Sequence, residues 1–102
     1  MNIAIFPNQI RTLPKELAAQ ISQFLQTREV RVFAEDQIAK EIDARPLSDI
    51  DPHSIDFMIT LGGDGTILRV IHRHWQIEAP ILAINLGGLG FMADITVDKI
   101  YP

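Results

Sequence analysis

Cysteine is absent from this 102-residue chain. Its absence excludes disulfide bonds, thiolate zinc sites and cysteine nucleophiles, and it fits a reducing compartment. Basic residues are also few, because 9 lysines and arginines stand against 13 acidic residues and leave a net charge of −4. These basic residues form no cluster in the sequence, so we expect no surface for nucleic acid or for an anionic membrane.

Long apolar runs are missing as well. The N-terminal apolar run is interrupted at Pro7, which makes it too short for a signal peptide, and no stretch approaches the ~18 residues of a membrane span. We therefore expect a cytoplasmic protein without membrane contact. Hydrophobic residues still make up 47% of the sequence, which is enough for the core of one modest domain over residues 1–102.

Short apolar segments alternate with amphipathic ones along the chain. This order predicts an α/β fold of three layers, with a mostly parallel sheet of about four strands and flanking helices. The helix that starts at Thr66 should turn Ile67, Leu68, Val70 and Ile71 toward the sheet, with His72 and His74 at the surface or at an edge. The predicted strands are 2–6, 30–34, 57–61 and 81–86, and the predicted helices are 14–26, a brief 37–42, and 66 to about 74.

The most informative stretch is the turn Gly62–Gly65, between a buried strand and a helix. Three glycines in four residues let a bulky group approach the backbone, and free N–H groups at a helix N-terminus can bind phosphate oxygens. The spacing matches neither a P-loop nor a Rossmann fingerprint. Asp64 is unusual there because phosphates repel a carboxylate. Three roles are open for it: helix cap, metal-linked ligand, or general base toward a hydroxyl that attacks a phosphoryl group.

A second glycine-rich stretch, residues 87–93, follows the strand 81–86. Because the carboxyl ends of parallel strands meet at one edge of a sheet, both glycine stretches should open on one crevice. Arg69 falls early in the helix after the first turn, where it is either an anion ligand or a solvated arginine. The aspartates of the polar segment 43–56 lack the order of a calcium loop and predict no metal site.

Two motifs, Gly62–Thr66 (GGDGT) and Asn85–Phe91 (NLGGLGF), resemble the N-terminal motifs of the NAD kinases. Lipid kinases of the diacylglycerol and sphingosine type and phosphofructokinases share the first motif, whereas the second is more specific. The resemblance implies phosphorylation of the adenosine 2′-hydroxyl of NAD by ATP or polyphosphate to give NADP, with a divalent cation, usually magnesium. It covers about the first third of a typical member, whose second, β-rich domain has no match in this chain.

The resemblance also implies roles for individual residues. Asp64 matches the base that activates the 2′-hydroxyl, and the complete protein is expected to be a homo-oligomer. Two alternatives stay open: a lipid kinase, and a non-catalytic nucleotide-binding module. The positions that match the NAD site are Asp64, Gly65, Leu68, Arg69 and Phe91, and those that match the turn at the phosphoryl donor are Gly62 and Gly63.

Overall fold

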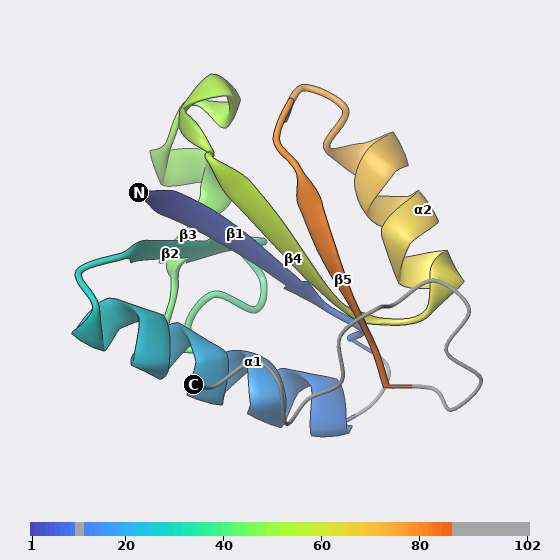
Figure 1. The fold of residues 1–102 in the computed structure, drawn as a ribbon, viewed down its shortest axis with the longest axis horizontal. Helices are drawn as coiled ribbons and strands as arrows, with labels where there is room; N and C mark the ends of the chain where they lie inside the picture. Colours follow the sequence, from blue (N-terminus) through green and yellow to red (C-terminus); the bar gives the residue numbers. More distant parts are fainter. Residues whose placement is uncertain (10–11, 87–102) are drawn as a thin grey trace.

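The computed structural model describes residues 1–9 and 12–86. Their strands form one sheet of five strands in the order β3-β2-β1-β4-β5, and every neighbouring pair is parallel (Figure 1). The predicted α/β class and parallel sheet are confirmed. The fifth strand is β3, a two-residue segment at the edge whose proline gives no strand signal in the sequence. The strands are β1 Asn2–Pro7, β2 Arg31–Ala34, β3 Arg45–Pro46, β4 Phe57–Gly62 and β5 Ile81–Asn85.

The two α-helices, α1 Thr12–Thr27 and α2 Asp64–Arg73, cover opposite faces of the sheet (Figure 1). Ile21 of α1 shares a core cluster with Ile5 of β1, whereas Val70 of α2 shares the other cluster with Phe6, the next residue of β1. Successive residues of a strand point to opposite faces, so the helices form the outer layers of a three-layer fold. None of the helices in the described ranges is long and apolar enough to cross a membrane.

The predicted helix 37–42 is wrong. The structure has a series of turns there. The backbone N–H groups of Ile38 and Ala39 both donate to the carbonyl oxygen of Glu35, and those of Glu41 and Ile42 both donate to that of Ile38. Hydrogen bonds over three residues and over four residues are therefore mixed. Asp43 then has a positive φ of 56°, which ends the segment. Ile38 and Ile42 are nevertheless buried, because the turns pack them into the core on the α1 side.

The orientation predicted for the second helix is also partly wrong. α2 begins at Asp64 and not at Thr66, and the side chains that it buries most deeply are Thr66 and Val70. Leu68 is 59% exposed and Ile71 is 49% exposed. A short helix that lies on a sheet buries one row of residues spaced by four, so the other apolar positions of α2 stay outside the core.

The direction of chain crossing changes between β1 and β4. From β1 the chain passes through α1 to β2 on one side, and from β4 it passes through α2 to β5 on the other side. Ligands of open parallel sheets bind in the crevice at the carboxyl ends of the strands, where the strand order reverses. The turn Gly62–Gly65 lies at this place in the fold.

Candidate functional site

The glycine turn joins β4 to α2 within two residues. Gly62 has a φ of +157°, a conformation that favours glycine, and a Cβ on it would lie 2.5 Å from the side-chain oxygen of Thr66. For Gly63 and Gly65, in contrast, a Cβ would meet none of the described atoms within 4 Å. Gly62 is therefore required by close packing, whereas Gly63 and Gly65 leave open space beside the first turn of α2.

The two predicted motifs start side by side. Gly62 is in register with Asn85 of β5, and the backbone N–H of Leu86 donates to the carbonyl oxygen of Gly62 at 3.1 Å. The rest of the second motif, including Phe91, lies outside the described residues. Within the described ranges, the expected meeting of the two stretches at one sheet edge is confirmed up to Leu86.

A cleft of about 480 Å³ opens at this edge. It brings together four of the predicted site residues: Gly62, Gly63, Gly65 and Arg69. Leu68 does not line it, since its side chain is on the exposed side of α2. The residues that line the cleft are Asn8, Gln9, Pro14, Gly62, Gly63, Gly65, Thr66, Arg69, Arg73 and Leu86.

Asp64 is the first residue of α2 and is exposed. Gly63, and not Asp64, occupies the N-cap position, and no side chain makes a cap hydrogen bond there. The helix-cap interpretation of Asp64 is therefore wrong. Its carboxylate stands between two cleft-lining glycines, at the helix end where the first N–H groups have no preceding carbonyl partners and the backbone dipole is positive.

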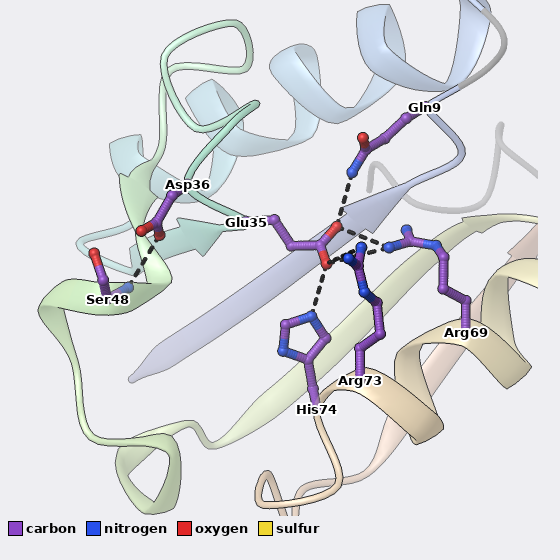
Figure 2. A network of polar contacts seen from close by, with 7 residues as sticks. All are labelled: Gln9, Glu35, Asp36, Ser48, Arg69, Arg73 and His74. Atoms are coloured by element: carbon purple, nitrogen blue, oxygen red, sulfur yellow. Dashed lines mark hydrogen bonds and ion pairs between the residues drawn. The ribbon is translucent and has the colours of Figure 1, made fainter.

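Sequence reasoning missed Glu35, which follows β2 and is the centre of a polar network (Figure 2). The side chain of Glu35 is 5% exposed. Gln9 donates to it at 2.8 Å, Arg69 Nη1 donates to both carboxylate oxygens at 3.0 and 3.1 Å, and His74 Nε2 lies 2.7 Å from Oε2. Arg73 Nη1 lies 3.8 Å from the same Oε2. The carboxylate of Glu35 thus connects the end of β2 to Arg69 and Arg73 in the second half of α2 and to His74 directly after it.

These contacts keep Glu35 ionised. Burial by itself would raise its pKa, but the hydrogen bonds from His74 and Arg69 and their positive charge outweigh burial and lower the pKa to about 2. His74, expected at the surface or at an edge, keeps 21% of its side chain exposed, but its ring contacts Glu35 and lies 4.9 Å from the ring of Phe6, centroid to centroid. The partners of His74 are distant in sequence, so its spacing from His72 could not indicate them.

Arg69 lies at the cleft, as expected for a residue within reach of an anion. Its Nη1 is bound to Glu35, whereas its Nη2 is buried and has no hydrogen-bond partner among the described residues. A buried donor without a partner costs about 1–3 kcal/mol. The solvated-helix interpretation of Arg69 is therefore wrong.

The one signal in the sequence that could have indicated Glu35 is an acidic residue directly after a buried strand, at the sheet edge that carries the glycine turn.

Comparison with known proteins agrees with this geometry. Residues 3–101 match the family model of the ATP-NAD kinase N-terminal domain. The NAD kinase of Protochlamydia amoebophila (strain UWE25) is 52% identical over 100 residues, which cover 98% of this chain and 36% of that protein. The NAD kinase of Syntrophobacter fumaroxidans is 35% identical over 102 residues, and that of Geobacter sp. (strain M21) is 31% identical over 105, with the same coverage.

The chain thus spans 36% of the length of these relatives. The match over nearly all of its residues favours the NAD kinase resemblance over the lipid-kinase alternative. Since a family-specific match and the glycine turn at the β1–β4 crevice agree, this chain belongs to the NAD kinase family.

Proposed function

We propose that the crevice beside Gly62–Gly65 takes part in the phosphorylation of the adenosine 2′-hydroxyl of NAD, with ATP or polyphosphate as the donor and NADP as the product. The observation that carries this proposal is the position of the GGDGT turn, which opens on the cleft at the reversal of strand order in a chain of the NAD kinase family. Gly62 and Gly63 are assigned to the donor side, and Gly65, Leu68, Arg69 and Phe91 to the NAD side. For Leu68, which does not line the cleft, and for Phe91 the assignment rests on the family resemblance alone.

Asp64 is the proposed general base. It takes the proton from the 2′-hydroxyl as the hydroxyl oxygen attacks the terminal phosphoryl group of the donor. The open space beside Gly63 and Gly65 lets substrate approach the exposed carboxylate of Asp64. This carboxylate lies at the N-terminus of α2, where the helix dipole favours the negative charge of phosphate groups.

The divalent cation, proposed to be magnesium, would be held mainly by the donor. No group of three or more acidic or histidine side chains within the described ranges could hold a metal ion. Asp64 is the one carboxylate of the turn, and magnesium characteristically keeps water and substrate phosphates as ligands beside one or two carboxylates. When bound, the ion neutralises charge on the transferred phosphoryl group.

The wider setting is also part of the proposal, and it draws on both the family resemblance and the composition of the chain. The complete enzyme is a cytoplasmic homo-oligomer, and its partners are NAD and the phosphoryl donor, without nucleic acid or membrane. The excess of acidic residues, 13 against 9 basic ones, supports the exclusion of nucleic acid.

A chimera tests the proposed function. Residues 1–102 replace the matched third of the Protochlamydia amoebophila NAD kinase, to which they are 52% identical. We expect NADP to form from NAD, magnesium and ATP or polyphosphate. Asp64→Asn in this chimera should lower turnover by roughly 10²–10⁴, the usual contribution of a positioned base, while the melting temperature and NAD affinity stay unchanged.

Asp49→Asn, which also removes an exposed carboxylate but one that does not line the cleft, serves as the matched control and should leave turnover unchanged. Turnover of the Asp64 variant within a few-fold of the parent chimera would show that Asp64 is not the base. Phosphorylation of diacylglycerol or sphingosine in place of NAD would favour the lipid-kinase alternative.

A further inference from the structure

We propose that Glu35 is a positioning residue that holds Arg69 and Arg73 against one wall of the cleft as a binding site for a phosphate group. The proposal deepens the proposed function and rests on it for the identity of the phosphate-bearing ligand. Nothing in the glycine motifs indicates it, because Glu35 comes from the end of β2.

The geometry places one buried carboxylate behind two arginines. Arg69 and Arg73 are four residues apart on α2, which puts them on one side of the helix, and both line the cleft. Both contact the same carboxylate, Arg69 through a two-oxygen contact at 3.0 and 3.1 Å and Arg73 at 3.8 Å. Gln9 and His74 hold Glu35 from other sides, so its position is fixed independently of the arginines (Figure 2).

The arginines keep unused binding capacity. A guanidinium has five N–H donors, and Arg69 uses one nitrogen, Nη1, to bind Glu35, while 30% of its side chain remains exposed. The side chain of Arg73 is 59% exposed. Two guanidiniums against one carboxylate leave one net positive charge at this wall. A phosphate group fits this arrangement because guanidinium groups bind its oxygens with paired N–H donors.

A purely structural role for Glu35 predicts the opposite effect on binding. If Glu35 only neutralised the arginines, its removal would make the wall more positive, and a phosphate would bind more tightly. If Glu35 positions the arginines, its removal leaves two long, flexible side chains unanchored, and a phosphate binds more weakly although the charge is more favourable. The sign of the change therefore distinguishes the two roles.

The test uses the chimera described above, labelled with ¹⁵N, and inorganic tripolyphosphate as the probe. The side-chain Nε–H signals of Arg69 and Arg73 should shift in a saturable way in the wild type. We expect Glu35→Gln, which removes the charge, to weaken affinity by roughly tenfold or more, the effect of losing one well-placed charge-assisted hydrogen bond. Glu35→Asp, which keeps the charge but shortens the side chain, should weaken it as well.

Asp36→Asn is the matched control, since it removes a neighbouring negative charge from a side chain that binds the backbone N–H of Ser48 and not the arginines (Figure 2). Its affinity should equal or slightly exceed that of the wild type. Affinity of Glu35→Gln equal to or above the wild type would overturn the proposal, and so would the absence of shifts at Arg69 and Arg73 in the wild type.

Arg73→Lys keeps the test decisive if the Glu35 variants fail to fold, because Arg73 is largely exposed and the charge is retained. A severalfold loss of tripolyphosphate affinity is expected, and unchanged affinity would overturn the pairing of the two arginines. Tripolyphosphate binding requires neither NAD nor turnover. A chimera that makes no NADP would therefore contradict the proposed function while leaving this site intact.

Discussion

At Glu35, burial and charge act against each other. A carboxylate that is 5% exposed loses most of its hydration, and its ionised form persists only because three donor side chains, one after β1 and two from α2 and its C-cap, replace the water. Removing one partner of a buried ion pair destabilises the fold by more than the intact pair stabilises it, since the remaining charge is left without hydrogen bonds. The stability of this network should therefore depend on pH.

The expected pH dependence follows from the lowered pKa of Glu35. The group binds protons less readily in the folded chain, with a pKa of about 2 against a usual 4.5, so its stabilisation is fully present above pH 4.5 and is lost as pH falls toward 2. The complete loss should amount to roughly 3 kcal/mol in the free energy of unfolding, of which about 2 kcal/mol is lost by pH 3. Urea unfolding at pH 6 and pH 3 measures this part of the change.

Glu35→Gln should flatten this part of the pH profile, whereas Glu16→Gln, at an exposed position of α1, should not. An equal pH dependence in wild type and Glu35→Gln would show that the network does not keep the carboxylate ionised.

The three glycines of the turn should respond differently to the same added methyl group. Gly62→Ala should lower the free energy of unfolding by about 1–3 kcal/mol, because its Cβ would overlap Thr66 and its φ is unfavourable. Gly65→Ala should leave the free energy of unfolding unchanged or raise it slightly, because alanine favours a helix and a Cβ at this position meets no other atom of the described residues within 4 Å. The added methyl group should nevertheless weaken NAD binding in the chimera, because it narrows the space through which NAD approaches the turn. Thermal unfolding and NAD titration of both variants check this contrast.

Among elements, α2 carries three different surfaces within ten residues. Thr66 and Val70 face the sheet, whereas Gly65, Arg69 and Arg73 recur every four residues and line the cleft. The third surface is exposed and apolar: Leu68, Ile71 and, just beyond the helix, Trp75 at 72% exposure. The helix thus combines anchoring and ligand contact, and its apolar pattern alone does not reveal which residues serve each purpose.

Truncation of buried and exposed apolar residues of α2 should separate these surfaces. Val70→Ala should cost about 1–3 kcal/mol, since Val70 is fully buried and the truncation leaves a cavity. Leu68→Ala removes a larger side chain but from an exposed position, so the expected change is within ±0.5 kcal/mol. Equal destabilisation of the two variants, measured by urea unfolding, would place Leu68 in the core.

For the whole molecule, the five-stranded sheet provides one wall of a crevice. Its strand reversal, the glycine turn and the Glu35 network all lie at the same edge. Phosphoryl transfer requires donor, metal and acceptor to be held together, and a misplacement of about 1 Å can cost ~10²-fold in rate. The chain spans 36% of the length of its relatives.

We therefore predict that the 102-residue chain alone forms no detectable NADP from NAD, ATP and magnesium, and that it is oligomeric or marginally stable. Its exposed apolar side chains on α2 favour self-association. Size-exclusion chromatography with light scattering and an NADP assay test both expectations, with the chimera as the positive control for activity. A monomeric chain that unfolds cooperatively and makes NADP would contradict this prediction.

Much of the fold follows from local sequence. The apolar runs at 2–6 and 57–61 predict buried parallel strands because a strand covered on both faces needs no polar alternation, and these strands are central in the sheet. The glycines at 62–65 predict the tight turn, and Gly62 is the one that close packing requires, because a Cβ there would overlap the side chain of Thr66. These features depend on neighbours a few residues away, so the sequence determines them without knowledge of the fold.

Tertiary structure decided what depends on distant partners. Glu35 contacts Arg69 and His74 across 34 and 39 residues of sequence, and only the docking of α2 beside the end of β2 brings them together. The same docking selects Val70 for burial and leaves Leu68 exposed, although both are apolar. A periodic pattern specifies that a helix has an apolar side, but the sheet against which it packs determines which row is buried and which charges meet.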